Sequence, residues 1–157
     1  MIRASFLGAP WLPTFKKNLL ASLKLADIKE GQVVYDLGSG DGRWLFKAAR
    51  FTKAKKLVGY EISLLPYGLS KIRWFFSPYK KRLDLKLANY FLADLSEADL
   101  IYCFGLPEVM KKLEPKLKQE LKPGARLVSC AFKFPNLKPI VVIKEKPSST
   151  PLYLYQF

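Results

Sequence analysis

The sequence predicts an α/β fold, in which a doubly wound, mostly parallel sheet ends in an antiparallel hairpin at its C-terminal edge. Short apolar, β-branched runs alternate with stretches of helical periodicity from residue 32 to residue 132. Two further extended runs then follow each other with no helix between them. Such alternation is typical of a parallel sheet covered on both faces and joined by right-handed crossovers. With 157 residues and no internal repeat, the chain is expected to form one domain over residues 1–157.

The individual elements follow from periodicity and from the residues that interrupt it. Prolines make residues 8–14 an extended entry segment, and Thr14 is expected to cap a first helix that continues to about Ile28. Glycines and prolines separate the later elements. The final run, 152–157, is apolar on both faces and is therefore expected to be central in the sheet or covered by a partner. Strands are predicted at 32–37, 56–61, 83–88, 100–104, 125–132, 140–144 and 152–157, and helices at 43–51, 64–76 and 108–121.

The composition excludes several kinds of chemistry. The chain contains no histidine, which removes His-based acid–base catalysis, Ser-His-Asp triads and nearly all zinc sites, so no metal is expected. Cys103 and Cys130 lie inside apolar runs and are expected to be buried thiols rather than a disulfide. The first residues lack the pattern of a signal peptide, and no apolar run approaches the ~20 residues that span a bilayer. A cytoplasmic location is therefore expected.

The net charge of +14, from 27 basic and 13 acidic residues, favours an anionic partner. Nucleic acid, peripheral contact with an anionic membrane and an acidic protein all fit it, and so does a solvated lysine-rich exterior. The basic runs Lys80-Lys81-Arg82 and Lys111-Lys112 form either an anion-binding surface or a solvated face, and a solvated face is expected. The aromatic side chains of 64–76 are expected to pack against the sheet.

A glycine-rich loop, Asp36-Leu37-Gly38-Ser39-Gly40-Asp41-Gly42, joins the first predicted strand of the sheet to the next helix. Glycines in this position let the backbone turn sharply and approach a ligand, as in Rossmann-like folds. Glu61 ends the next strand, 19 residues after Gly42, where such folds place an acid on ribose hydroxyls. Asp36 and Asp41 would repel a pyrophosphate and attract a cationic sulfonium, which favours S-adenosylmethionine over NAD.

The loop, extended to Arg43, resembles the first motif of class I (seven-strand) S-adenosylmethionine-dependent methyltransferases. Three more segments narrow the resemblance, namely Ala9-Pro10-Trp11-Leu12-Pro13-Thr14, Gly59-Tyr60-Glu61 and Phe104-Gly105-Leu106-Pro107-Glu108-Val109-Met110. Together they resemble the small protein-lysine methyltransferases of the ATP synthase c-subunit and adenine nucleotide translocator type. The similarity runs from about Gly8 to Phe134.

The resemblance implies a cofactor site for S-adenosylmethionine. It places Asp36, Gly38, Ser39 and Gly40 against the methionine part and Glu61 on the ribose. Asn89 and Tyr90 would lie near the adenine. Thr14 and the entry segment 1–14 would close over the cofactor.

The resemblance also implies a protein substrate with an acceptor lysine. Phe104, Gly105 and Trp11 are the candidates for the acceptor channel, with Tyr67 a weaker one, because ligands of such folds bind where strands end. RNA or DNA methylation and a non-catalytic S-adenosylmethionine-binding module stay open as alternatives. Against base methylation, Phe104-Gly105-Leu106-Pro107 stands where an Asn/Asp-Pro-Pro-aromatic step is typical, and no Pro-Cys nucleophile occurs.

Overall fold

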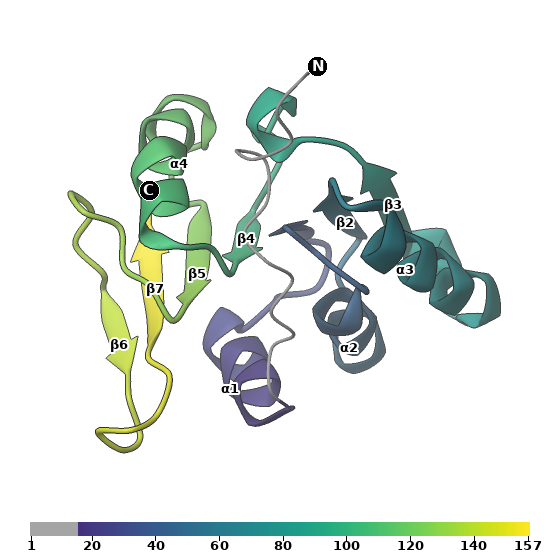
Figure 1. The fold of residues 1–157 in the computed structure, drawn as a ribbon, viewed down its shortest axis with the longest axis horizontal. Coiled ribbons are helices and arrows are strands. Elements are labelled where there is room, and N and C mark those ends of the chain that lie inside the picture. Colours follow the sequence, from purple (N-terminus) through teal and green to yellow (C-terminus); the bar gives the residue numbers. More distant parts are fainter. Residues whose placement is uncertain (1–15) are drawn as a thin grey trace.

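The computed structural model describes residues 16–157, with side chains from Asn18 onward, and arranges them around one seven-stranded sheet (Figure 1). The helices are α1 (Lys16–Ala26), α2 (Arg43–Phe51), α3 (Leu64–Phe76) and α4 (Pro107–Glu120), with short 3-10 turns η2 (Lys80–Arg82) and η3 (Tyr90–Leu92). The strands are β1 (Val33–Leu37), β2 (Lys56–Glu61), β3 (Leu83–Leu87), β4 (Leu100–Cys103), β5 (Arg126–Cys130), β6 (Val141–Ile143) and β7 (Leu152–Gln156).

The strand order β3-β2-β1-β4-β5-β7-β6 confirms the predicted sheet. The first five strands in this order are parallel, β7 runs antiparallel to β5, and β6 pairs antiparallel with β7 at the edge. β7 is therefore an interior strand, which explains why it is apolar on both faces. The order reverses between β1 and β4, and in open α/β sheets the crevice at such a reversal is where ligands bind.

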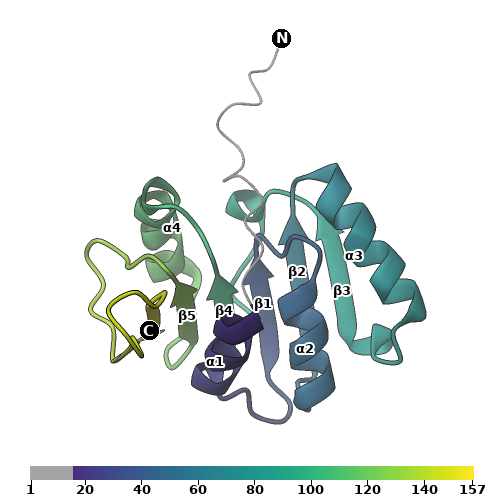
Figure 2. The ribbon, with the colours of Figure 1, turned by 60° about the horizontal axis from the view of Figure 1, so that its bottom comes forward.

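Helices cover both faces of the sheet (Figure 2). On one face, α1, α2 and half-buried residues of α3 share a core in which the Trp44 and Tyr102 rings stack with centroids 4.4 Å apart. On the other face, α4 packs its Met110, Leu113 and Leu117 against the sheet. Within the described residues no helix is both long and apolar enough to cross a bilayer.

The aromatic residues of α3 do not all pack as the sequence predicted. Trp74 is half-buried and donates its indole hydrogen to the Leu83 carbonyl (3.0 Å), and the Tyr67 hydroxyl donates to the Leu85 carbonyl (3.4 Å). Phe75 and Phe76, by contrast, are 65% and 78% exposed. The prediction of packing was wrong for these two, because both rings project from the face of α3 that points away from the sheet.

Arg82 also departs from the expectation of a solvated basic run. Its guanidinium donates to the carbonyl of Ala49 in the last turn of α2 (2.5 Å) and to those of Thr52 (3.0 Å) and Ala54 (3.1 Å), which follow the helix. A helix leaves its last carbonyls without helical partners, and a cation there is favourable. Arg82 therefore caps α2, while Lys80 and Lys81 are exposed.

Candidate cofactor and acceptor site

The candidate site lies where β1, β2 and β4 end at the same edge of the sheet (Figure 2). In the strand register, Leu37 at the end of β1 is beside Tyr60 of β2 and Cys103 of β4. The residues that follow each of these positions are consequently brought together. They are Gly38, Glu61 and Phe104, which lie 23 to 66 residues apart in the chain.

The glycine loop turns sharply at its glycines and is anchored to β2. Gly38, Gly40 and Gly42 have φ angles of 83°, 56° and 76°, in the left-handed region that favours glycine. The amides of Gly38 and Ser39 both donate to the Tyr60 carbonyl at 2.9 Å. A side chain added at Gly38 would meet no atom within 4 Å, so this part of the loop has open space beside it.

Glu61 holds the loop from the end of β2. One carboxylate oxygen, Oε2, accepts from the Gly40 amide at 2.8 Å, while Oε1 accepts from the amides of Ile62 (2.8 Å) and Ser63 (2.7 Å). Three backbone donors thus fix the orientation of the carboxylate, which is only 8% exposed. Oε2 has a single backbone donor and keeps the capacity to accept one more hydrogen bond, which fits a ribose hydroxyl.

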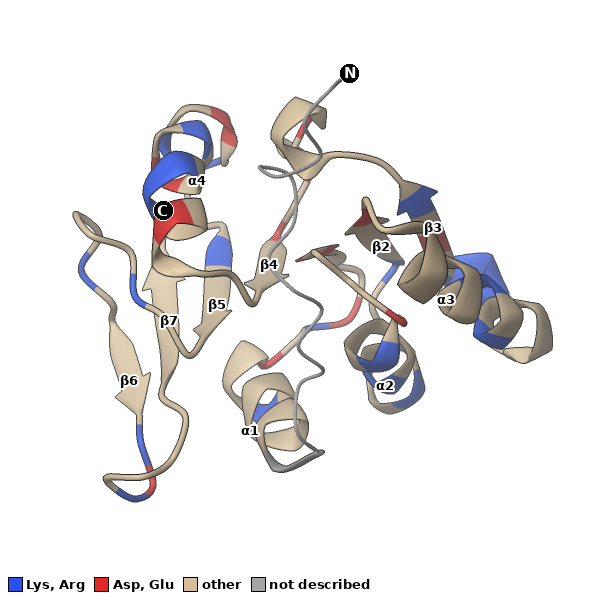
Figure 3. Ribbon diagram, in the orientation of Figure 1, with Lys and Arg blue, Asp and Glu red and all other residues tan. Residues whose placement is uncertain are grey.

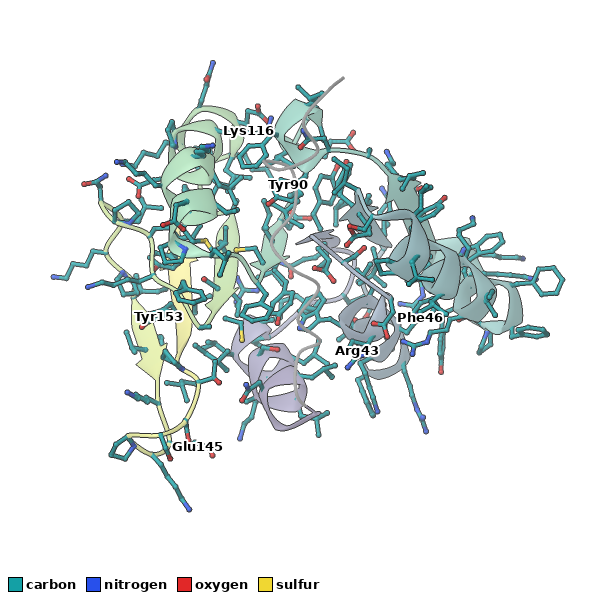
Figure 4. The ribbon with its side chains drawn as sticks, viewed as in Figure 1. Arg43, Phe46, Tyr90, Lys116, Glu145 and Tyr153 are labelled. Carbon is teal, nitrogen blue, oxygen red and sulfur yellow. The ribbon has the colours of Figure 1, made fainter. Side chains whose placement is uncertain are left out.

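The two aspartates of the loop have different surroundings. Asp36 is 2% exposed, and burial, followed by the nearby carboxylates of Glu61 and Asp41, raises its pKa well above the ordinary value. Asp41 is paired with Arg43 at the first turn of α2 (Figure 4) and with Arg73 of α3, at 2.8 and 3.1 Å. Burial raises the pKa of Asp41, but the hydrogen bond and charges of Arg43 and Arg73 outweigh burial and hold it below the ordinary value.

This pairing corrects the electrostatic part of the sequence interpretation. The charge of Asp41 is already neutralised, so the attraction for a cationic ligand falls to Asp36 and Glu61. Within the described residues neither acid forms an ion pair with Lys or Arg. A bound cation would relieve the mutual repulsion of these carboxylates, and S-adenosylmethionine, which carries an amino group and a sulfonium, fits this requirement. Over residues 16–157 no group of His, Cys, Asp and Glu is arranged to hold a metal ion.

The adenine candidates lie at the same edge. Asn89 caps η3, and its side-chain oxygen accepts from the Phe91 amide at 3.0 Å, which leaves its NH₂ group as the part able to meet a base. Burial raises the pKa of Tyr90, and the nearby Cys103 and Glu61 raise it further. The phenol therefore lies close to Cys103 at the end of β4 and Glu61 at the end of β2 (Figure 4).

The acceptor candidates Phe104 and Gly105 directly follow β4. Phe104 is half-buried against the core. Gly105 is buried, and a side chain there would come within 3.1 Å of Val109 Cγ1, so the glycine lets α4 pack closely on the strand end. The Leu106 carbonyl accepts from the Met110 amide and belongs to the first turn of α4.

The other predicted residues do not join Phe104 and Gly105 in the described structure. Tyr67 faces β3, and Trp11 and Thr14 lie outside the described residues.

Arg73 is the residue near the site that sequence reasoning missed. Its guanidinium pairs with the Asp41 carboxylate and also donates to the Asp41 carbonyl at 3.2 Å. It therefore fastens the glycine loop to α3 across 32 residues of sequence. A single arginine among exposed residues of a helix carries no local signal of such a partner.

A Rossmann-like sheet, a glycine loop at its reversal point and buried acids beside that loop define a class of enzyme, the S-adenosylmethionine-dependent methyltransferases. Comparison with known proteins agrees, since the family model of the ANTKMT methyltransferase domain matches residues 36–141. The chain belongs to this methyltransferase family, and S-adenosylmethionine is its cofactor.

Three relatives illustrate the range of similarity. A protein-lysine N-methyltransferase of Saccharolobus islandicus (strain REY15A) is 37% identical, over 93% of this chain and 92% of its own. The human lysine N-methyltransferase of the ATP synthase c-subunit is 31% identical over 83% of this chain, which spans 54% of that protein. Among solved structures, an RNA methyltransferase from Salinibacter ruber with bound S-adenosyl-L-homocysteine has 32% identity and a TM-score of 0.86, covering 92% and 93% of the two chains.

Proposed function

We propose that the enzyme transfers a methyl group to the ε-amine of a lysine in a protein substrate. The observation that supports this most directly is the similarity to the Saccharolobus islandicus protein-lysine N-methyltransferase, which extends over nearly the whole of both chains. In this proposal Asp36, Glu61 and the loop amides hold the cofactor, with Asn89 and Tyr90 beside the adenine.

The surroundings of Phe104 and Gly105 suit an amine acceptor. S-adenosylmethionine, when bound, supplies a methyl group on a sulfonium, and its in-line transfer requires alignment rather than a side-chain nucleophile. The attacking lysine must be neutral. Gly105 is buried and Phe104 is half-buried, so an amine brought between them would meet a medium of low polarity that disfavours charge. The same medium would lower the pKa of a lysine amine brought to the carbonyls of Phe104 and Gly105.

RNA methylation is the second candidate function. The Salinibacter ruber structure supports it, because that protein is described as an RNA methyltransferase and is similar over most of this chain. The net charge of +14 also suits a polyanion. Against it, the residues after β4 are Phe104-Gly105-Leu106-Pro107, which offer no polar side chain to orient a base amine.

Transfer of a tritiated methyl group distinguishes the two functions. The enzyme is incubated with labelled cofactor and a cell lysate, and portions are then treated with nuclease or protease. We expect label that survives nuclease, is lost with protease and is recovered as methyl-lysine after acid hydrolysis. Label lost to nuclease would contradict the proposal and favour RNA.

A pair of variants tests the cofactor site by calorimetric titration of S-adenosylmethionine. Glu61→Ala removes the acceptor for ribose and three hydrogen bonds to the backbone, and we expect cofactor affinity in calorimetric titration to fall about 100-fold. Glu30→Ala, an exposed acid in the turn before β1, is the control and should leave the affinity unchanged. Equal affinities for Glu61→Ala and wild type would refute the ribose assignment.

A further inference from the structure

The outer face of α3 is apolar although it is exposed. Six side chains form this α3 apolar face, and they are between 41% and 78% exposed, namely Leu64, Leu65, Leu69, Ile72, Phe75 and Phe76. Positions 65, 69, 72 and 76 follow the 3.6-residue period and lie in one row, and 64 and 75 lie beside it. The buried residues Pro66 and Ser70 are on the opposite side, toward the sheet. An exposed apolar surface of this kind marks an interaction site.

The surface around the α3 apolar face is strongly basic. Between residues 42 and 83 the chain has eleven Lys and Arg and a single acid, the buried Glu61. Lys and Arg positions are coloured blue along both α2 and α3 (Figure 3). Several lie against aromatic rings, with Lys80 Nζ 5.9 Å from the centroid of the Phe75 ring and Lys71 Nζ 4.3 Å from that of Trp74.

We propose that α3 is a docking surface for an anionic membrane. A helix that binds such a membrane lies in the plane of the interface, with Leu and Phe side chains at the boundary of headgroups and acyl chains. Lysines at its border are attracted to anionic headgroups. Phe75 and Phe76, with Ile72 and the leucines, supply the first element, and Lys71, Lys80 and Lys81 supply the second.

The charge also argues against other occupants of this face. A second copy of the chain would bring another net charge of +14 against the same basic surroundings, and the two would repel each other. RNA would be attracted by the lysines, and Phe75 and Phe76 could stack on bases. The other four side chains of the face, Leu64, Leu65, Leu69 and Ile72, are aliphatic and neither stack on bases nor bind phosphate, so they favour a lipid surface.

The α3 apolar face is connected to the cofactor site. α3 begins three residues after Glu61, and Arg73 from its last turn holds Asp41 of the glycine loop. Docking through α3 would therefore bring the ends of β1 and β2 near the membrane surface. Taken with the proposed function, this points to lysines of proteins located at that surface, although membrane binding itself does not depend on methyl transfer.

Flotation with lipid vesicles tests the proposal without cofactor or acceptor. We expect the chain to float with vesicles of phosphatidylcholine and about 30% phosphatidylglycerol, and not with phosphatidylcholine alone. Ile72→Ser/Phe76→Ser should weaken binding about tenfold or more, because two side chains no longer enter the bilayer. Ile140→Ser/Val142→Ser, which changes two exposed apolar residues near the opposite edge of the sheet, should bind as wild type. Equal loss in both double variants, or no binding by wild type, would overturn the proposal.

Charge and depth are tested by two further measurements. Lys80→Gln/Lys81→Gln should weaken binding and reduce its salt dependence more than Lys144→Gln/Lys146→Gln, which removes the same charge at the β6–β7 turn. Brominated lipids should quench the added tryptophan of Phe76→Trp and not that of Val142→Trp. Equal quenching of the two would contradict insertion of α3. Sedimentation of wild type as a dimer that Ile72→Ser/Phe76→Ser dissociates would assign the face to a second copy instead.

Discussion

At the scale of one residue, the carboxyl group of Asp36 serves the cofactor site at a cost to the stability of the folded protein. Its carboxyl group is buried at the end of β1 beside the carboxylate of Glu61, and its pKa is raised for these reasons. In the free enzyme an ionised Asp36 therefore costs folding free energy, whereas a cationic ligand would offset that cost. A site for a cation is thus built from a charge that the fold alone disfavours.

Replacing Asp36 by Asn separates these two effects. Because the pKa is higher in the folded than in the unfolded state, ionisation destabilises the fold as pH rises from about 4, the unfolded value, through the raised folded pKa. We expect the variant to have a higher Tm than wild type at pH 7, and the difference to disappear below about pH 4. Calorimetric titration should show cofactor affinity reduced about tenfold or more.

The control for this prediction is Glu30→Gln, which removes an exposed carboxylate and should change neither quantity. A lower Tm for Asp36→Asn at pH 7, together with unchanged cofactor affinity, would show that the Asp36 charge has a structural role instead.

At the scale of elements, α2 and η2 are joined by one side chain. α2 is short and is ended by Thr52, whose amide and hydroxyl both bond to the Ala48 carbonyl. Arg82 then supplies donors to three more carbonyls from 28 to 33 residues away. The end of the helix, the turn after it and the start of β3 are consequently fastened together.

Loss of the Arg82 cap should destabilise the protein. Arg82→Gln removes the charge and most of the donors, and we expect the free energy of unfolding in urea to fall by about 2–4 kcal/mol. Lys81→Gln, at the exposed neighbouring position, should change it by less than about 0.5 kcal/mol. Similar values for the two variants would mean that the three carbonyls are satisfied by water without cost.

At the scale of the whole molecule, the C-terminal strand completes the sheet. β7 lies between β5 and β6, so the last residues of the chain are interior to the sheet rather than at its edge. Tyr155 is 1% exposed, and its hydroxyl accepts from the buried Phe134 amide at 3.0 Å while the two rings meet edge to face. The segment after β5 is thereby held against the end of the chain.

This arrangement predicts a difference between two tyrosines of one strand. Tyr155→Phe leaves the Phe134 amide without its acceptor, and we expect a loss of about 1–3 kcal/mol in the free energy of unfolding. Tyr153→Phe removes a hydroxyl from a half-buried ring on the same side of β7 (Figure 4) and should change it by less than about 0.5 kcal/mol. Chemical denaturation followed by circular dichroism measures both, and equal losses would refute the role of the Tyr155–Phe134 bond.

The sequence by itself determined the order and type of the elements, because helix and strand periods are local properties of a chain. The helices at 43–51 and 64–76 and the strand at 56–61 have the bounds that were predicted. The glycine loop and Glu61 were likewise recognised, since their spacing follows from one strand–helix–strand unit. The family was inferred from short motifs, and the comparisons confirm it.

Only the tertiary structure decided which charges and apolar side chains have partners. In the folded chain Asp41 pairs with Arg73, Arg82 caps the end of α2, and Phe75 and Phe76 stay exposed. These outcomes depend on contacts between elements distant in sequence, and an arginine or phenylalanine at a helical position has the same local pattern with or without a partner. The glycines and the neighbouring Arg43 thus belong to the local chemistry of the loop, whereas its anchoring to β2 and the second partner of Asp41, Arg73 of α3, come from tertiary contacts.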